Sequence, residues 1–196
     1  MTMIAKKTSG VKPGAYDSTI VGVYDLGLQS SEKFKSESPK CLLLFEVVSD
    51  SPMPTTIPKF YTLTLSEKGK LRPDIEILLG RKLSPDEDKG FAMRKLLGLK
   101  AHLQIIDDDG KSKIASIIKI PANKPVPVSL PLIFFDMDAG RPIPQATPEY
   151  VTKIIKRSTE FKKGWPPQVQ EEDNGPEPED TDENGFALDG SELEPY

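Results

Sequence analysis

Two short stretches of the sequence place an aromatic residue directly beside basic ones. Lys33-Phe34-Lys35 lies in a polar segment, and Lys59-Phe60-Tyr61 begins a run of alternating character. Aromatic rings can stack on the bases of a single-stranded nucleic acid while neighbouring lysines neutralise its phosphates. A half-exposed strand, or a loop that packs back on its own domain, would contain the same residues. Both interpretations stay open at this point.

Residue types and spacing give little support to other functional chemistry. The single histidine, His102, falls in an alternating stretch and has no spacing that would pair it with Cys41 or a serine. No Cys/His cluster has the spacing of a zinc site, and no Gly-rich segment resembles a phosphate loop. The run Asp107-Asp108-Asp109-Gly110 lacks the distal Glu of a calcium loop and is typical of a tight turn. We therefore expect no enzyme activity, no catalytic residues, no metal and no cofactor.

Charge is distributed unevenly along the 196 residues. Residues 1–164 hold 26 basic and 19 acidic residues, a net charge of +7, whereas residues 165–196 hold eleven acidic and no basic residues. A basic body favours a polyanionic partner, although a solubilising tail on an ordinary basic domain has the same composition. The tail is too polar to bury a core, so we expect it to be disordered.

Two neighbouring strands would position the residues around Phe60. Residues 41–48 are apolar almost throughout, as in a strand covered on both faces, which would bury Cys41 as a free thiol. Residues 59–65 alternate, with Tyr61 and two leucines on one side. The other side carries one aromatic and two hydroxyls: Phe60, Thr62 and Thr64. A long strand over residues 15–28 precedes them, with a bulge or bend at Gly22.

The following segments predict helices and a hairpin. An amphipathic stripe indicates a helix that ends at Gly80; its apolar residues are Leu71, Ile75, Leu78 and Leu79. Ser84 and Glu87 form a capping box, and residues 91–97 indicate a further short helical piece. Residues 101–105 and 113–120 alternate about an Asp-Gly turn, the signal of a hairpin. Its second strand would point three residues inward: Ile114, Ile118 and Ile120.

After the hairpin the chain becomes rich in proline. We expect residues 121–148 to wrap back over the domain and to anchor through the apolar insert Leu132-Ile133-Phe134-Phe135. A short helix should follow, with Thr147 as N-cap and Pro148 as its first residue. Its inward residues would be Tyr150, Val151, Ile154 and Ile155.

Five strands with a helix between the third and the fourth follow the order of an OB-fold barrel. We therefore expect a mainly β fold, a β-barrel of OB type with one or two short helices, a C-terminal helix and a disordered acidic tail. The predicted parts are a flexible N-terminal arm (1–14), the OB-fold domain (15–121), a Pro-rich extension with a short helix packed on the barrel (122–164), and the tail (165–196).

Several segments, taken in order and spacing, resemble a family of small phage proteins grouped with phage-encoded OB-fold single-stranded DNA-binding proteins. They are residues 21–27, 43–47, 59–76, 95–98, 114–117, 131–136 and 148–151. The similarity spans about residues 15–160. It implies sequence-tolerant binding of single-stranded DNA in a phage replication or recombination system. The sequence also shows no signal peptide and no apolar run of membrane-spanning length, so we expect it in the cytoplasm of the bacterial host.

The resemblance and the basic–aromatic pattern together define the expected sites. The DNA-binding residues would be Lys33, Phe34, Lys35, Lys40, Lys59, Phe60, Thr62, Thr64, Lys68, Lys70, Arg72 and Lys113. The acidic tail is similar to tails of replication single-strand binders, which contact partner enzymes and compete with DNA. Its end, Leu-Glu-Pro-Tyr, replaces the more usual run of Asp followed by Phe. The partner-binding residues would be Phe186, Leu188, Leu193 and Tyr196.

Two alternatives to single-stranded DNA binding remain. One is a protein-interaction or inhibitor module without nucleic-acid affinity, which would act on a host or phage protein through residues 121–148 or the tail. The other, a minor one, is RNA as the bound strand, because an OB face rarely excludes 2′-hydroxyls by features visible in a sequence.

Overall fold

The computed structural model describes residues 10–31 and 36–165, and one long strand organises them. The strands are β1 (Gly14–Ser31), β2 (Ser36–Val47), β3 (Thr55–Thr62), β4 (Lys100–Asp108), β5 (Lys111–Lys119) and β6 (Ile133–Phe135). β1 pairs antiparallel with β2 and with β4, so the main sheet has the order β3-β2-β1-β4-β5. β6 adds to β1 in parallel. The expected strands 15–28 and 41–48 are confirmed, although both are longer than predicted.

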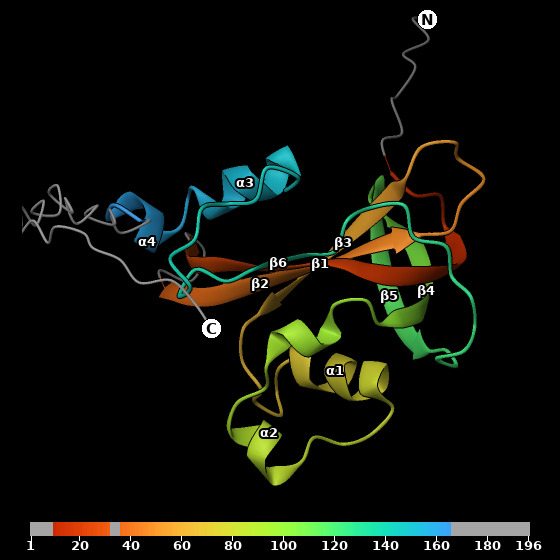
Figure 1. Ribbon diagram of the computed structural model, residues 1–196, viewed down its shortest axis with the longest axis horizontal. Coiled ribbons are helices and arrows are strands. Elements are labelled where there is room, and N and C mark those ends of the chain that lie inside the picture. The colour runs from red at the N-terminus through yellow and green to blue at the C-terminus, as the bar shows by residue number, and fades with distance from the viewer. Residues whose placement is uncertain (1–9, 32–35, 166–196) are drawn as a thin grey trace, which may run out of the picture.

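Short helices flank this sheet. They are α1 (Leu71–Leu79), α2 (Pro85–Lys89), the 3₁₀ helix η1 (Met93–Leu96), α3 (Glu149–Ile155) and α4 (Thr159–Lys162). Figure 1 shows α3 and α4 on one side of the β1–β2 pair, and α1 and α2 on the other. The mainly β fold with short helices is confirmed, and the sheet is open, because no pairing of described strands joins β3 to β5. No described helix has the length and apolar character needed to cross a bilayer.

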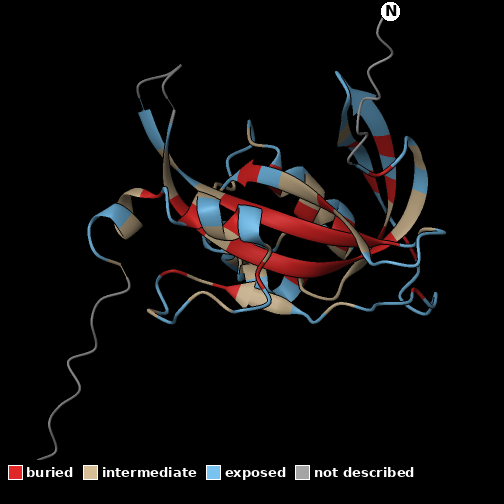
Figure 2. Ribbon diagram, turned by 90° about the horizontal axis from the view of Figure 1, so that it is seen from above, coloured by how far each residue is buried: buried red, intermediate tan, exposed pale blue. Residues whose placement is uncertain are grey.

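Both faces of β2 are buried over residues 41–47. Leu43 and Phe45 belong to a core that includes α1 and the β4–β5 hairpin, whereas Leu42 and Leu44 pack in a second core with Val151 of α3. Figure 2 shows this as continuous buried ribbon through the middle of the long strands. A strand covered on both faces needs apolar residues at every position, which is why its sequence does not alternate.

The bend expected at Gly22 is present as an irregularity in the ladder. The register between β1 and β2 shifts once between Ile20 and Gly22. A side chain at position 22 would collide with the ring of Tyr24, which lies directly against this glycine. Glycine is therefore required here for close packing and not for an unusual backbone angle.

The helix signals are confirmed in detail. Leu71, Ile75 and Leu78 are buried, and Gly80 ends α1 in the left-handed conformation with φ of 69°. Ser84 and Glu87 form the capping box at the start of α2. These are local features that depend on neighbouring residues alone, so they follow directly from the sequence.

The predicted hairpin is present, but one residue of its second strand, Ile118, was predicted on the wrong face. Ile118 was expected inward and is 54% exposed, whereas Ile117 is buried. The register shifts between Gln104 and Ile105, where Ile105 pairs with Ile114 and Gln104 pairs with Ser116. The extra residue on β5 reverses the alternation beyond it, so the inward position moves from 118 to 117.

The strand expected at residues 59–65 also needs correction, because β3 begins at Thr55 and ends at Thr62. The predicted alternation is confirmed for the residues that lie within β3: Tyr61 is buried and Phe60 is exposed. Leu63 and Leu65 lie beyond the strand and are half-buried against the first core.

The Pro-rich segment wraps back over the sheet as expected. β6 pairs with the middle of β1, Phe135 is buried, and the Glu46 carboxylate accepts hydrogen bonds from the backbone N–H groups of Ser129 and Leu130. Leu132, in the same apolar insert, is 52% exposed. The insert therefore anchors through its last residues only.

The helix expected after this segment starts later than predicted. The N-cap is Pro148, without a side-chain hydrogen bond, and not Thr147. Val151 and Ile155 are buried as expected, but Tyr150 is 39% exposed and was wrongly placed inward. Tyr150 lies about 100° around the helix axis from Val151 and further still from Ile155, so it falls at the edge of the apolar stripe that these two residues form. The short helix α4 that follows was not predicted separately.

Candidate nucleic-acid interface

Phe60 lies at the exposed end of a row of side chains that runs across three strands. Phe60 pairs with Leu42 of β2, and Leu42 pairs with Tyr24 of β1. Leu42 and Tyr24 are almost completely buried under the C-terminal segment, whereas Phe60 is 51% exposed. An aromatic ring that stays half in solvent on a regular strand is available to stack on another flat group.

Lys40 and Thr62 extend this surface by one step along the strands. They are paired residues of β2 and β3, and Lys40 Nζ donates a hydrogen bond of 2.7 Å to Thr62 Oγ1. Both belong to the same face as Phe60, because residues two apart on a strand share a face. We call these three residues the Phe60 patch. A ring beside an ammonium and a hydroxyl offers stacking and phosphate contacts at neighbouring points.

Lys59 points to the opposite face of the sheet. Its Nζ lies 2.7 Å from Asp74 Oδ2 of α1, and its side chain is only 18% exposed. Tyr61 donates a hydrogen bond of 2.8 Å to the same oxygen, and its burial raises the pKa of its hydroxyl. Lys59 therefore holds α1 against β3 and does not lie with Phe60.

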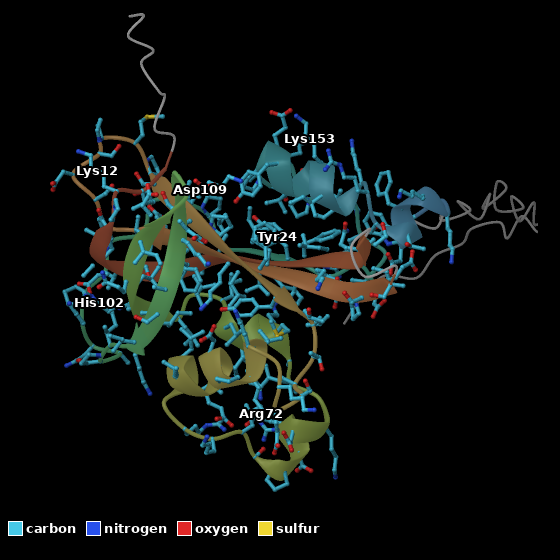
Figure 3. All side chains as sticks on the ribbon, turned by 180° about the vertical axis from the view of Figure 1, so that it is seen from behind. Lys12, Tyr24, Arg72, His102, Asp109 and Lys153 are labelled. Carbon is cyan, nitrogen blue, oxygen red and sulfur yellow. The ribbon has the colours of Figure 1, made fainter. Side chains whose placement is uncertain are left out.

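The other predicted cations are spread over the molecule. Arg72 lies 2.9 Å from Asp88, and Lys113 lies 2.6 Å from Asp108 on the β4–β5 hairpin. Lys68 and Lys70 are exposed just before α1. Figure 3 shows Arg72 on the α1 side of the molecule, below the sheet, far from α3. The structure does not gather these residues around Phe60.

Some predicted residues have other outcomes. Thr64 is half-buried and lines a cleft that opens on the face opposite to Phe60. The run Lys33-Phe34-Lys35 and the tail residues lie outside the described part of the chain; the tail residues are Phe186, Leu188, Leu193 and Tyr196. Of the twelve predicted DNA-binding residues, the structure therefore brings together Lys40, Phe60 and Thr62.

A second basic surface was missed by the sequence analysis. It consists of exposed residues at the end of α4 and in the short connections after α3 and after α4, here called the α3–α4 cations: Lys156, Arg157, Lys162 and Lys163. Within the described ranges none of them forms an ion pair, whereas Lys153 is paired with Glu149 at 2.6 Å. Figure 3 shows Tyr24 beneath α3 and Lys153 on the outer side of this helix.

The sheet positions this basic surface through polar contacts. The Glu160 carboxylate accepts the backbone N–H of Leu28 at 2.9 Å, and Thr159 donates to Glu37 at 2.7 Å. The N–H of Leu28 is free of β2 because the β1–β2 pairing shifts register between Asp25 and Gly27, and the N–H can therefore bond to Glu160. The signal in the sequence was the density of cations over residues 153–163, which hold five basic residues and one acid.

His102 has a structural contact. Its Nδ1 lies 2.9 Å from Asp17 Oδ1, and Lys124 Nζ lies 2.5 Å from Asp17 Oδ2. Lys124, and then His102, hold the pKa of Asp17 below its usual range. The three side chains join β4, β1 and the Pro-rich segment, so His102 lies on a strand, as its alternating surroundings predicted, and has a structural contact there.

Comparison with known proteins assigns this chain to no family. No family model, no curated protein and no solved structure matches the chain. Among the described residues, no group of three or more His, Cys, Asp or Glu side chains is arranged to hold a metal ion. Function therefore has to be inferred from the surfaces themselves.

Proposed function

We propose that this protein binds single-stranded DNA with little sequence preference, through the Phe60 patch and the α3–α4 cations. The exposed ring of Phe60 beside the Lys40–Thr62 pair carries this proposal. Stacking on an aromatic ring contributes about 1–3 kcal/mol per base and tolerates every base, since each has a π face. The cations supply phosphate contacts, which bind any sequence equally.

We also propose that the open sheet is a partly open barrel of OB type. Two observations support this. The two ends of the sheet approach each other, with Cα atoms of β3 and β5 within 8 Å. The helices α1, α2 and η1 lie between β3 and β4 in the chain, where an OB barrel carries its helix. The segments that resemble phage single-strand binders favour a role in phage replication or recombination.

The acidic tail fits the same proposal. Eleven carboxylates follow a body with a net charge of +7. Such a tail would compete with DNA for the basic surfaces, and its apolar residues would recruit replication or recombination proteins. At neutral pH the competition is electrostatic and weakens with salt.

A fluorescence titration with oligo-dT and with duplex DNA, at low and at moderate salt, tests the proposal. We expect binding to the single strand at low salt that falls steeply as salt rises, with a slope of about −0.7 per phosphate contact. Duplex DNA should bind more weakly, because stacked and paired bases cannot reach Phe60. Absence of oligo-dT binding at both salt concentrations would contradict the proposal.

A protein-interaction module without DNA affinity is the second candidate. Its support is a set of exposed apolar side chains on the Pro-rich segment and the β2–β3 loop: Met53, Val128 and Leu132, at 72%, 42% and 52% exposure. Isolated exposed apolar residues are common on protein surfaces, so this support is weaker. A complex with a host or phage protein that survives nuclease treatment, from a chain with no oligonucleotide affinity, would favour it.

A further inference from the structure

A cleft of about 550 Å³ opens on the face of the sheet opposite to the Phe60 patch. Asp25, in its wall, pairs with Cys41, and Cys41 pairs with Tyr61, so the cleft belongs to the Tyr61 side of the sheet. Its lining residues come from β1, the β3–α1 loop, the first residue of α1, residues 91–94 and residues 134–138. Its volume is within the range of sites that bind drug-sized ligands.

The walls of the cleft are apolar and aromatic. Phe91 and Phe134 are half-buried and line it together with leucines of the β3–α1 loop. The guanidinium carbon of Arg94 lies 5.2 Å from the centre of the Phe134 ring. This stack shows that the ring already accepts a planar guanidinium on its face.

The charge of the cleft is opposite to that of the proposed DNA surfaces. Three carboxylates line it, from Asp25, Asp136 and Asp138, against the single guanidinium of Arg94. Asp25 Oδ1 accepts the backbone N–H of Gly27 at 2.8 Å. Burial raises the pKa of Asp25, and the charges of Asp136 and Asp138 raise it further. A cation among these carboxylates would relieve their repulsion, whereas a DNA phosphate would be repelled.

We propose that this cleft binds an arginine side chain of a partner polypeptide, together with an apolar residue next to it. The guanidinium lies against Asp25 and Asp136, and the apolar neighbour fills the space beside Phe91 and Phe134. Arginine suits the cleft better than lysine, because its planar group both stacks on rings and pairs with carboxylates through two hydrogen bonds. The volume exceeds the needs of one side chain, which is why a second residue enters. This inference does not depend on DNA binding.

Titration of the full ¹⁵N-labelled chain, followed by NMR, tests the proposal with the probe acetyl-Phe-Arg-amide. We expect saturable shifts of backbone signals in residues 91–94 and 134–138. The matched probe acetyl-Phe-citrulline-amide has the same shape without the charge and should bind at least about tenfold more weakly, which corresponds to about 1.4 kcal/mol. Equal affinity for the two probes, or no shifts at millimolar arginine probe, would overturn the proposal.

Variants of the cleft carboxylates test whether the arginine probe binds in this cleft. Asp25→Asn and Asp136→Asn should each weaken binding of the arginine probe several-fold, since each removes one carboxylate charge. Asp86→Asn is the matched control, because that carboxylate is 97% exposed on α2 and is not among the cleft residues. Asp136→Asn keeps the test valid if Asp25→Asn disturbs the Gly27 hydrogen bond and the fold. Preferential binding of deoxyguanosine monophosphate in the cleft would identify a nucleotide site and overturn the proposal.

Discussion

Lys40 and Lys59 lie on neighbouring strands and face opposite sides of the sheet. Among the described residues the Lys40 ammonium donates a hydrogen bond to the Thr62 hydroxyl and forms no ion pair, whereas Lys59 is paired with Asp74 in a partly buried position. A phosphate can therefore reach the first ammonium but would have to displace a carboxylate from the second. Adjacent cations can thus have a binding role and a structural role on the same sheet.

We predict that Lys40→Met lowers the affinity for oligo-dT and reduces the salt slope by about 0.7, the value for one phosphate contact. Lys59→Met should leave the slope unchanged. Instead it should lower the free energy of unfolding by about 1.5–3 kcal/mol, because Asp74 loses a charged partner. Binding titrations and denaturant unfolding of both variants check this. The reverse pattern would show that DNA binds on the Lys59 side.

The two buried tyrosines form a second contrast at the residue scale. The Tyr61 hydroxyl donates to Asp74 at 2.8 Å, whereas the Tyr24 hydroxyl makes no hydrogen bond of good geometry among the described residues. Burial, with Tyr150 nearby, raises the pKa of Tyr24 to about 12, so both hydroxyls stay protonated at neutral pH. The buried Thr147 hydroxyl, which also lacks such a hydrogen bond, lies near enough to lower the pKa of Tyr24, but the effect of burial is larger. A buried hydroxyl without a partner costs free energy of folding, and a bonded one contributes to it.

We therefore expect Tyr61→Phe to lower the free energy of unfolding by about 1 kcal/mol or more, and Tyr24→Phe to leave it unchanged or to raise it. Neither ring should lose its packing, since phenylalanine keeps it. Urea unfolding of both variants at pH 7 makes the comparison. A loss of stability in Tyr24→Phe equal to that in Tyr61→Phe would show that the Tyr24 hydroxyl has a partner.

At the scale of elements, α3 and α4 have two roles. Val151 and Ile155 of α3 cover the middle of β1 and β2. Lys162 ends α4, and the other α3–α4 cations lie in the connections that directly follow the two helices. In this arrangement a ring at the edge of β3 and a row of cations belong to the same side of the sheet. A single strand could pass from one to the other without crossing the sheet.

We predict that the double variant Lys162→Gln/Lys163→Gln binds oligo-dT more weakly and with a salt slope reduced by up to about 1.4, or 0.7 for each phosphate contact. The control Lys82→Gln/Lys89→Gln removes the same charge from the α1–α2 side and should not change the slope. Titration over a salt series measures both. An equal reduction in the two variants would indicate a general effect of net charge.

Local signals in the sequence predicted the elements well, and long-range contacts account for the errors. The Gly80 cap and the Ser84 capping box depend on residues close in sequence and are confirmed. The inward position at Ile118 is wrong because a bulge on β5 is set by pairing with β4.

The candidate site was only partly predictable for the same reason. Phe60, Lys40 and Thr62 were identified from alternation, but whether a strand face is covered depends on a helix about 90 residues later in the chain. The partner of Lys59 is likewise an aspartate on another element. The α3–α4 cations were visible as a basic run over residues 153–163, yet a basic run alone does not show that it lies on the same side of the sheet as Phe60.

At the scale of the whole molecule, charge separates into a basic body and an acidic tail. Trp165 is the last described residue, and it packs at 5.6 Å, edge to face, on Phe135 and donates to the Met137 carbonyl. All eleven acidic residues of the C-terminal region follow this tryptophan. A truncation that keeps Trp165 therefore removes the charge without removing an anchor of the second core.

We predict that removal of residues 166–196 raises the affinity for oligo-dT, most strongly at low salt, because the tail no longer competes for the cations. The melting temperature should stay unchanged. A variant in which the eleven acidic residues are replaced by Asn and Gln is the control for chain length and should bind like the truncated chain. Unchanged or weaker binding by both would exclude a competing role of the tail.

The affinity of Phe60→Ala for oligo-dT tests the central claim most directly, with Ile118→Ala as the matched control. Both side chains are apolar, sit on strands and are about half exposed, at 51% and 54%. We expect Phe60→Ala to bind about 5- to 150-fold more weakly, the loss of one stacked base, with little change in melting temperature. Ile118→Ala should bind like the unmodified protein. Unchanged DNA affinity in Phe60→Ala, in a protein that does bind oligo-dT, would contradict the claim that this face of β3 is the DNA-binding surface.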